Sequence, residues 1–363
     1  MHWDAAFVQD PIATLRRLAA EQGPLAEFSM AAQRVYLLSH PHLVQQAFAS
    51  RHLTKRQGKG AALCLLGRGL MTSEGELNRT QRRALRPLFS ASAQLGWAEI
   101  VAEETQALCQ GWRAGQCLNT LAEFSRLSLA VACRCLVGRR LEEEPLILES
   151  LESSLDSANQ SDSLRAIRAG LDPVADRLLR EGRGPLVESL LATDIDDELR
   201  RDEIITMLLG AHETTASAMA WSMRLLALHP DLEGAHPRQV VAEALRLYPP
   251  VQLGEYLLQV PATLIMSPMV THYLPEFWPE PERFQPQRFA ADRPVAGSYF
   301  PFGGGDRICI GESLAWLEAS QAVSVIAPQW RLMPLDPGPV RLRPLAALRP
   351  ACGLPARAQP IVS

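Results

Sequence analysis

The chain has 363 residues, of which 47% are hydrophobic and 21% are charged, a composition that supports a sizeable buried core and excludes a disordered or collagen-like chain. Its 36 basic and 40 acidic residues give a net charge of −4, which argues against a generally basic nucleic-acid-binding protein. We recognise no secretory signal and no run of about 18 uncharged apolar residues, so we expect a cytoplasmic protein without a membrane anchor.

The first three fifths of the chain have the pattern of helices of moderate length. A helix is predicted over 11–20, because Asp10 can cap a helix whose first residue is a proline. Alternating apolar and polar residues predict a strand over 34–38. A further helix is predicted over 79–89, after a turn at 72–75.

The cysteine content indicates neither a disulfide framework nor a zinc site. The chain carries seven cysteines, an odd number, and none of them has the spacing of a zinc-binding motif. Cys133 and Cys135 lie in the apolar stretch 127–137, where thiols usually behave as small hydrophobic side chains. We therefore expect both of them to be buried.

The longest helical pattern extends from Asp196 to His229. Its apolar residues recur at steps of three and four, and Pro230 follows its end. A helix of about 30 residues would be roughly 45 Å long, enough to cross a whole domain. We expect one continuous helix here, at the centre of the fold.

Beyond Pro249 the chain becomes rich in proline, which favours extended and turning backbone. Short strands are predicted over 252–260 and 263–266, and a last helix over 311–327, followed by weak strand signals. There is no internal repeat and no low-complexity linker. Residues 1–363 are therefore predicted to form a single domain that is mainly α with a small β region.

The segment from Pro301 to Gly311 carries the residues with the clearest chemistry. Its three consecutive glycines permit positive φ angles and leave the backbone open to a flat ligand. Cys309 stands just before the last predicted helix, where unpaired backbone amides and the helix dipole stabilise a thiolate. Arg307 offers a forked cation that suits a carboxylate. On these residues alone, a metal ligand, a phosphate-binding loop and a structural cysteine all stay open.

The same segment resembles the haem-binding loop of the cytochrome P450 family, whose pattern is Phe-x-x-Gly-x-x-x-Cys-x-Gly. The matching residues are Phe302, Gly305, Cys309 and Gly311. The resemblance implies haem b as the cofactor, with the Cys309 thiolate as the axial ligand of its iron. It also implies that Arg307 binds a haem propionate and that Phe302 packs beside the sulfur.

A second match is the pair Glu243 and Arg246, which corresponds to the Glu-x-x-Arg motif of the family. At a three-residue step the two side chains share a helix face, so an ion pair between them is expected. The Pro-Glu-Arg-Phe segment over 281–284 follows, and its Arg283 is predicted to be the third member of a Glu-Arg-Arg cluster. The resemblance implies that this cluster braces the cysteine loop; we assign it no catalytic step.

A third match lies in the middle of the long predicted helix, in the segment Gly-Ala-His-Glu-Thr-Thr over 210–215. Its His-Glu pair is superficially similar to a zinc protease motif, but Ala216 stands where that motif needs a second histidine. The segment instead resembles the oxygen-activation motif of the cytochromes P450. That resemblance implies that Glu213 and Thr214 are an acid and alcohol pair in proton delivery. Ala211 replaces the glycine that is common in the family and is expected to narrow the oxygen groove.

A fourth and partial match is the basic helix over 79–89. Its cations recur at three- and four-residue steps and form one stripe. In the family, an arginine of this helix and a residue four positions before it hold a haem propionate. The resemblance assigns these roles to Arg82 and to Asn78, although the family usually has an aromatic residue or a histidine at the second position. The remaining arginines would suit the docking of an acidic electron-transfer protein.

These matches occur in the order of the family and imply a single-domain cytochrome P450-like fold. The chain is short for that family. Its missing part lies between the long central helix and the Glu-x-x-Arg helix, a stretch that contains Pro230 and Pro237. After Pro250 the usual propionate-binding basic residue is also absent, and the segment 252–255 stands in its place.

The implied function is that of a haem-thiolate monooxygenase that inserts one oxygen atom from O2 into an apolar small molecule. No Gly-x-Gly-x-x-Gly region is present, so electrons are expected from a separate ferredoxin- or flavodoxin-type partner. The alternative is a truncated P450-like protein that binds haem or another ligand without competent oxygen activation. A peroxide-driven enzyme is a third hypothesis, in which Glu213 and Thr214 would be dispensable.

Overall fold

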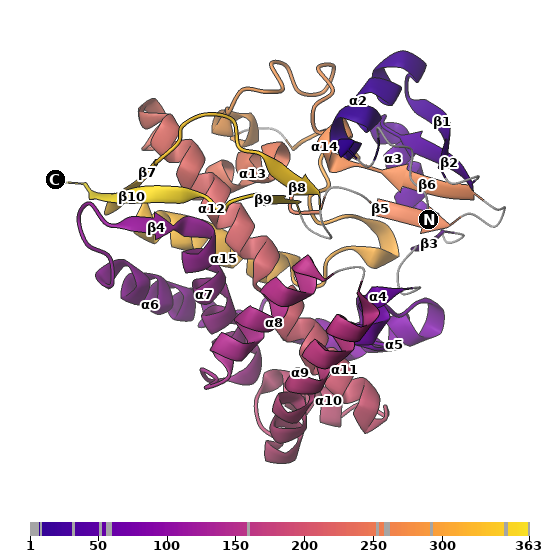
Figure 1. Ribbon diagram of the computed structural model, residues 1–363, viewed down its shortest axis with the longest axis vertical. Coiled ribbons are helices and arrows are strands. Elements are labelled where there is room, and N and C mark those ends of the chain that lie inside the picture. The colour runs from indigo at the N-terminus through magenta and orange to yellow at the C-terminus, as the bar shows by residue number, and fades with distance from the viewer. Residues whose placement is uncertain are drawn as a thin grey trace. The chain divides into compact units, whose positions relative to one another are not determined.

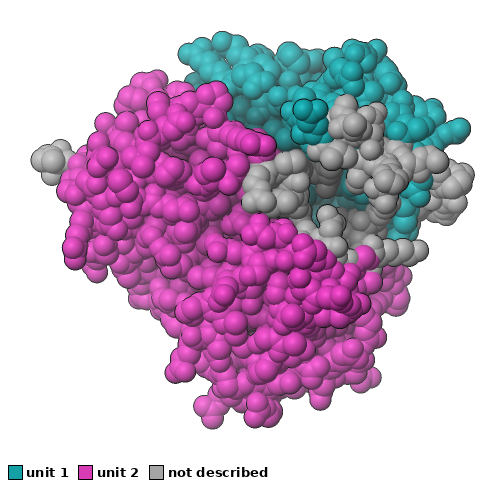
Figure 2. All heavy atoms as spheres, in the orientation of Figure 1, with its two compact units in different colours: residues 1–56, 242–309 teal, residues 57–241, 310–363 magenta. Residues whose placement is uncertain are grey.

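The structure is a computed structural model that describes the chain in ten stretches. They are 7, 9–30, 33–50, 53–55, 60–157, 160–251, 254–257, 262–290, 293–344 and 348–361. The chain divides into two compact units, which Figure 2 shows in different colours. The first unit comprises residues 1–56 and 242–309, and the second comprises residues 57–241 and 310–363.

The first unit is built on a five-stranded sheet. The strand order is β1-β2-β6-β5-β3, with β2 and β6 parallel and the other pairs antiparallel (Figure 1). Every residue of β6 is buried, as expected for a strand inside a sheet. The strands are β1 (Leu25–Met30), β2 (Gln33–Leu38), β3 (Thr54–Lys55), β5 (Gly254–Leu257) and β6 (Ala262–Met266).

The helices of the first unit are short, and three of them, α2, α3 and α14, pack on hydrophobic residues of this sheet. Leu15 packs with Val35, Ile265 and Val270 in one apolar cluster. The Asp10 side chain accepts a hydrogen bond from the Ala13 amide at 2.9 Å, so the predicted N-cap is confirmed. The helices are α2 (Pro11–Gln22), α3 (Pro41–Ala49), α14 (Pro268–Thr271), the 3₁₀ turns Pro286–Phe289 and Gly305–Arg307, and the C-terminal part of α13 (Pro237–Leu247).

The second unit is mainly helical, and α12 packs against α7 and α15 at its centre. One apolar cluster joins α8, α9 and α11 through residues such as Ile147, Leu178 and Leu208. The helices are α4 (Ala61–Leu66), α5 (Gly75–Leu85), α6 (Trp97–Gln110), α7 (Thr120–Ala132), α8 (Glu144–Asp156), α9 (Ser161–Glu181), α10 (Pro185–Leu191), α11 (Asp197–Gly210), α12 (Glu213–Leu228) and α15 (Glu312–Ile326). The turns are 3₁₀ Arg86–Phe89, π Cys133–Val137 and 3₁₀ Pro230–Leu232.

Two small sheets complete the second unit. One has the order β4-β10-β7 and the other pairs β8 with β9, all antiparallel. The prediction of a mainly α fold with a small β region is therefore confirmed. The strands are β4 (Cys117–Asn119), β7 (Trp330–Pro334), β8 (Leu342–Pro344), β9 (Leu348–Pro350) and β10 (Pro355–Pro360).

The prediction of one continuous helix over 196–229 is wrong. The segment forms two helices, α11 and α12, which are separated at Ala211 and His212. The ring Nδ1 of His212 pairs with the Leu208 carbonyl at 2.9 Å. Because a helical N–H of residue 212 would use that same carbonyl, the side chain competes with the backbone and interrupts the helix.

The other predicted elements hold within a few residues. The connection between α12 and α13 contains one three-residue 3₁₀ turn and no α-helix, in a stretch that the structure describes completely, as the short spacing predicted. The helix predicted over 79–89 begins earlier, at Gly75, and changes to a 3₁₀ turn after Leu85. Of the strand predicted over 252–260, residues 252, 253 and 258–260 lie outside the described residues.

Candidate functional site

The loop before α15 presents Cys309 on a constrained backbone. The Cys309 amide donates to the Phe302 carbonyl at 3.0 Å, and the Gly303 amide donates to the Phe300 carbonyl at 3.0 Å. Gly303 and Gly305 adopt φ angles of 73° and 61°, which favour glycine. The Cys309 side chain is exposed, so the loop offers its sulfur rather than burying it in packed hydrocarbon.

Phe48 packs against the glycines of this loop and explains why they carry no side chain. A Cβ atom on Gly304 would lie 2.5 Å from Phe48 Cδ2, and a Cβ atom on Gly305 would lie 2.2 Å from the Phe48 carbonyl oxygen. A Cβ atom on Gly303 would meet no described atom within 4 Å. The loop is therefore packed against the protein at two glycines and open at the third.

Glu243 and Arg246 form the ion pair that their spacing predicted. Both side chains are fully buried, and both oxygens of Glu243 accept hydrogen bonds from Arg246 at 2.8 Å. The third cation is Arg288, whose Nε lies 3.2 Å from Glu243 Oε1. A bidentate, buried pair of this kind fixes geometry rather than adding much net stability.

The assignment of Arg283 to this cluster is wrong. Its guanidinium pairs with Glu280 at 3.3 Å, and its side chain is 66% exposed. Only its backbone carbonyl reaches the cluster, where it accepts from Arg246 Nη2 at 3.3 Å. The chain carries two successive Pro-x-Arg-Phe segments, 281–284 and 286–289, and the second one supplies the buried arginine. That repeat is the signal that could have identified Arg288.

Glu213 is a buried carboxyl group at the start of α12. Its Oε1 lies 2.5 Å from Nε of Arg349, which belongs to β9. Burial raises the pKa of Glu213, the Arg349 cation opposes that shift, and the Glu152 carboxylate adds to it. Thr214 follows on the same helix and is half-buried. The sequence contains no local signal for the contact with Arg349.

His212 stands between Ala211 and Glu213 in the segment 210–215. Its side chain is fully buried, and its Nε2 has no hydrogen-bond partner among the described residues. Burial lowers the pKa of His212 to about 4, so the ring is neutral at physiological pH. Ala211, at the C-terminal end of α11, is half-buried.

Comparison with known proteins identifies the family. A model of the family described as Cytochrome P450 matches residues 4–167 and 238–341. The chain belongs to the cytochrome P450 family. Its relatives include cyclooctat-9-en-7-ol 5-monooxygenase of Streptomyces melanosporofaciens, which is 30% identical over 91% of this chain and 87% of that protein. Pentalenene oxygenase of Streptomyces avermitilis is 24% identical over 90% of this chain and 88% of that protein.

Solved structures agree with this membership. A six-coordinated cytochrome P450 from Thermus thermophilus superposes with a TM-score of 0.84 and 32% identity, over 97% of this chain and 99% of that chain. The protein is therefore a P450 monooxygenase, an oxidoreductase. The match to the family model does not include residues 168–237. The roles assigned to Glu213 and Thr214 therefore rest on the local motif and stay predictions.

The family implies a haem-thiolate cofactor, and Cys309 fits it. Its side chain is exposed at the mouth of α15, where a thiolate can form and bind a metal. Cys133 and Cys135 do not fit. Both are buried as predicted, and burial raises the pKa of each thiol to about 12. Phe302 and Arg307 are half-buried in the same loop, and Gly311 is the N-cap residue of α15.

Asn78 does not fit the role of a propionate ligand, and that prediction is corrected here. Its Nδ2 donates to the Leu70 carbonyl and to Ser73 Oγ, both at 3.0 Å. Both amide hydrogens are thus used to hold the turn before α5, and no donor is left for a carboxylate. Arg82 is half-buried in the last turn of α5, and its predicted role is unaffected.

Sequence reasoning missed two buried acids of α11 that hold the same turn. Asp202 accepts from the Arg68 amide at 2.7 Å and pairs with Arg168 at 2.7 Å. Glu203 accepts from the Leu70 amide at 3.1 Å. Burial raises the pKa of Glu203 to about 8, the Leu70 amide opposes this, and Asp202 adds to it. Both acids follow two arginines near the helix start, a pattern that is typical of a solvated first turn.

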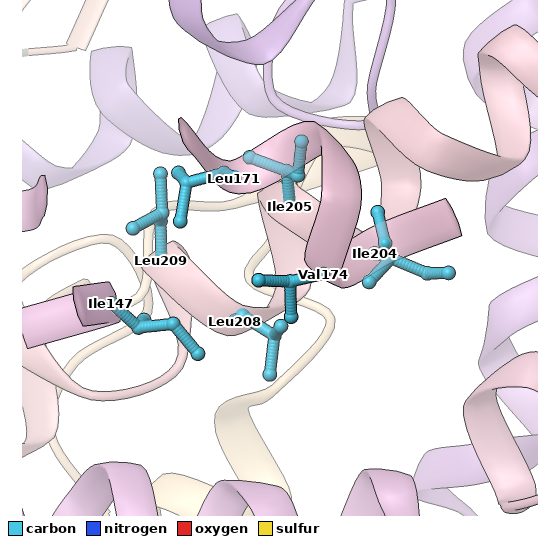
Figure 3. Close-up of a pocket in the computed structure, with 8 residues that line it drawn as sticks. Ile147, Leu171, Val174, Ile204, Ile205, Leu208 and Leu209 are labelled. Carbon is cyan, nitrogen blue, oxygen red and sulfur yellow. The ribbon is translucent and has the colours of Figure 1, made fainter. Parts of the chain in front are cut away.

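A small cavity in the second unit lies between α8, α9 and α11. Figure 3 shows that its labelled residues, among them Ile147, Val174 and Ile204, bring only hydrocarbon side chains to it. An apolar cavity of this kind offers no polar anchor and is a packing gap in the core rather than the active site.

In the described ranges, no helix combines the length and the apolarity needed to cross a bilayer.

Proposed function

We propose that this P450 holds haem b through the Cys309 thiolate and inserts one oxygen atom from O2 into an apolar small molecule. The observation that supports this most is the exposed Cys309 on a loop whose backbone is fixed by the Phe302 and Phe300 carbonyls. When bound, a thiolate-ligated haem supplies the iron centre for oxygen activation. The cytoplasmic location stays a prediction.

Two further roles, propionate binding and proton delivery, are assigned to residues of this chain. We assign Arg307 and Arg82 to the haem propionates, because a guanidinium group suits a carboxylate. We assign Glu213 and Thr214 to proton delivery. Burial favours the protonated carboxyl of Glu213 and the Arg349 cation favours the ionised form, and such opposing effects suit an acid that both releases and regains a proton.

The substrate that we propose is largely hydrocarbon with few polar groups. Two relatives are named for such compounds, the unsaturated alcohol cyclooctat-9-en-7-ol and the alkene pentalenene. A separate ferredoxin- or flavodoxin-type protein would deliver the electrons. Arg83 and Arg86 are exposed at the C-terminal end of α5 and its following turn, where they could meet an acidic partner.

The alternative is a P450-like protein that binds haem or another ligand without activating oxygen. The observation that favours it is the proximity of the Arg349 cation to Glu213, because a nearby cation favours the ionised carboxylate, which carries no proton to deliver. The two functions differ in what happens to electrons once they reach the protein.

The test is turnover with a surrogate ferredoxin, its reductase and NADPH, using substrates selected by the spin-state shift of the haem. Thr214→Ala should lower the product formed per NADPH consumed, while NADPH consumption continues. Thr215→Ala, which removes the neighbouring hydroxyl, is the matched control and should keep the coupling of wild type. Haem-loaded protein that forms no product and does not respond to Thr214→Ala would support the binding protein instead.

A further inference from the structure

His272 is a buried residue at the end of α14 that the sequence motifs do not include. It is fully buried, in the first unit, between the Glu-Arg-Arg cluster and the segment that leads into the cysteine loop. Both of its ring nitrogens have partners. Nε2 lies 3.0 Å from the Phe300 amide nitrogen, and Nδ1 lies 3.2 Å from the Arg246 carbonyl oxygen.

These two partners determine the protonation of the ring. The Phe300 amide can only donate, so Nε2 must be the unprotonated acceptor. The Arg246 carbonyl can only accept, so Nδ1 must carry the proton and donate it. Burial lowers the pKa of His272 to about 3, so the ring stays in this neutral form over the physiological range.

On one side His272 is attached to Arg246 twice. Its Nδ1–H donates to the Arg246 carbonyl, and its own carbonyl accepts from Arg246 Nη1 at 2.9 Å. Arg246 is in turn held by both oxygens of Glu243. The position of the imidazole is therefore determined by the buried ion pair. Aromatic rings also limit its movement, because Tyr299 stacks on it with a centroid distance of 5.2 Å.

On the other side His272 holds the backbone that enters the cysteine loop. The Phe300 amide donates to Nε2 of His272, and the Phe300 carbonyl accepts from the Gly303 amide. The Phe300 ring packs edge-on against His272 at 5.2 Å and against Phe48 at 5.6 Å. The residue that begins the loop is thus fixed at both of its polar backbone groups and by its side chain.

We propose that His272 is a positioning residue for Cys309. The hydrogen bond from the Phe300 amide to Nε2 transmits the geometry of the buried Glu243–Arg246 pair to the loop that presents the sulfur. This proposal rests on the proposed function only in taking Cys309 as the haem ligand. It assigns a separate task to each nitrogen: Nδ1 attaches the ring to the cluster, and Nε2 fixes the loop.

Two conservative variants separate those tasks. In His272→Gln the side-chain oxygen stands as many bonds from Cβ as Nε2 does, so it can still accept from Phe300. In His272→Asn the amide stands at the Nδ1 position, so it can donate to Arg246 but cannot reach Phe300. Tyr273→Phe is the matched control. It removes the neighbouring, partly buried hydrogen bond to the Leu247 carbonyl and leaves the loop contacts intact.

The first measurement is amide hydrogen exchange of the protein as purified, by mass spectrometry. His272→Asn should accelerate exchange in peptides that cover 299–309 by about fivefold, the factor that corresponds to one lost hydrogen bond. His272→Gln and Tyr273→Phe should leave these rates near wild type. Peptides that cover β6 should be unchanged in all three variants, which distinguishes a local effect from general unfolding.

The second measurement is the carbon monoxide spectrum of the reduced, haem-loaded proteins. His272→Asn should lose a larger fraction of the thiolate-type band than His272→Gln or Tyr273→Phe does. Equal behaviour of the two His272 variants, or an equal loss in Tyr273→Phe, would overturn the proposal. A wild-type protein without the thiolate-type band would contradict the proposed function instead, and the exchange rates would still decide whether His272 fixes the loop.

Discussion

Replacing Glu203 by glutamine should make the protein increasingly more stable than wild type as the pH rises. Glu203 is fully buried in α11, and one of its oxygens accepts from the Leu70 amide at 3.1 Å. Glutamine keeps a side-chain oxygen for that hydrogen bond and removes the titrating group. Asp202, its neighbour, keeps its ion pair with Arg168 in the variant.

The size of the effect follows from the pKa of Glu203, which burial raises from 4.5 to about 8. Between these values the unfolded chain has lost the proton and the folded protein keeps it. Stability therefore falls as the pH rises from the unfolded pKa to the folded one. The free energy of unfolding of Glu203→Gln relative to wild type should grow by on the order of 3 kcal/mol between pH 5 and pH 8.

The assay is urea unfolding followed by circular dichroism at several pH values in that range. Glu198→Gln removes an exposed carboxyl group from the same helix and is the control. It should shift stability by less than about 0.5 kcal/mol, in parallel with wild type at every pH. If the profiles of wild type and Glu203→Gln also run parallel, Glu203 is ionised in the folded protein and this view of its environment is wrong.

Three further predictions concern the other buried contacts. Arg349→Met leaves the Glu213 carboxyl buried without its cation and should lower the free energy of unfolding by about 3 kcal/mol at neutral pH. The loss should shrink as the pH falls, because protonation removes the buried charge, and urea unfolding at several pH values checks this trend. Arg288→Leu should lower the free energy of unfolding by about 3 kcal/mol, and Arg283→Leu should lower it by less than about 1 kcal/mol, because only Arg288 contacts the buried Glu243. Thermal unfolding measures both, and a larger loss in Arg283→Leu would restore Arg283 as the third member of the cluster. Gly304→Ala should reduce the haem retained per protein after gel filtration, because the new methyl group would displace the loop, and unchanged retention would show that the close approach at this glycine is unimportant.

The elements that sequence could predict are those whose signal is local. The Asp10 cap, the helix end before Pro230 and the glycine loop before Cys309 all depend on neighbouring residues, and each is present. The ion pair of Glu243 and Arg246 is also local, because a three-residue step places both on one helix face.

The predictions that failed needed information from distant residues. Arg283 and Arg288 occupy the same local pattern, and only the fold shows which one reaches Glu243. Asn78 shares a helix face with Arg82, but its donors are taken by a turn that its own helix pattern does not reveal.

Two features of the central helix pair show the same limit. The periodicity of apolar residues carries no sign of the His212 ring that competes for a backbone carbonyl and divides the helix. The burial of Asp202 and Glu203 arises from the Arg68–Leu70 turn, which is remote in sequence. Hydrophobic patterning reports which face of a helix is buried, and it does not report which polar groups are buried with it.

The carbon monoxide spectrum of the reduced protein tests the central claim, that Cys309 sulfur binds haem iron, most directly. Wild type should give the long-wavelength band of thiolate-ligated haem, Cys309→Ser should lose it, and Cys352→Ser, which alters another exposed cysteine, should keep it. A thiolate-type band that persists in Cys309→Ser, or that is absent from freshly purified wild type, would contradict the account.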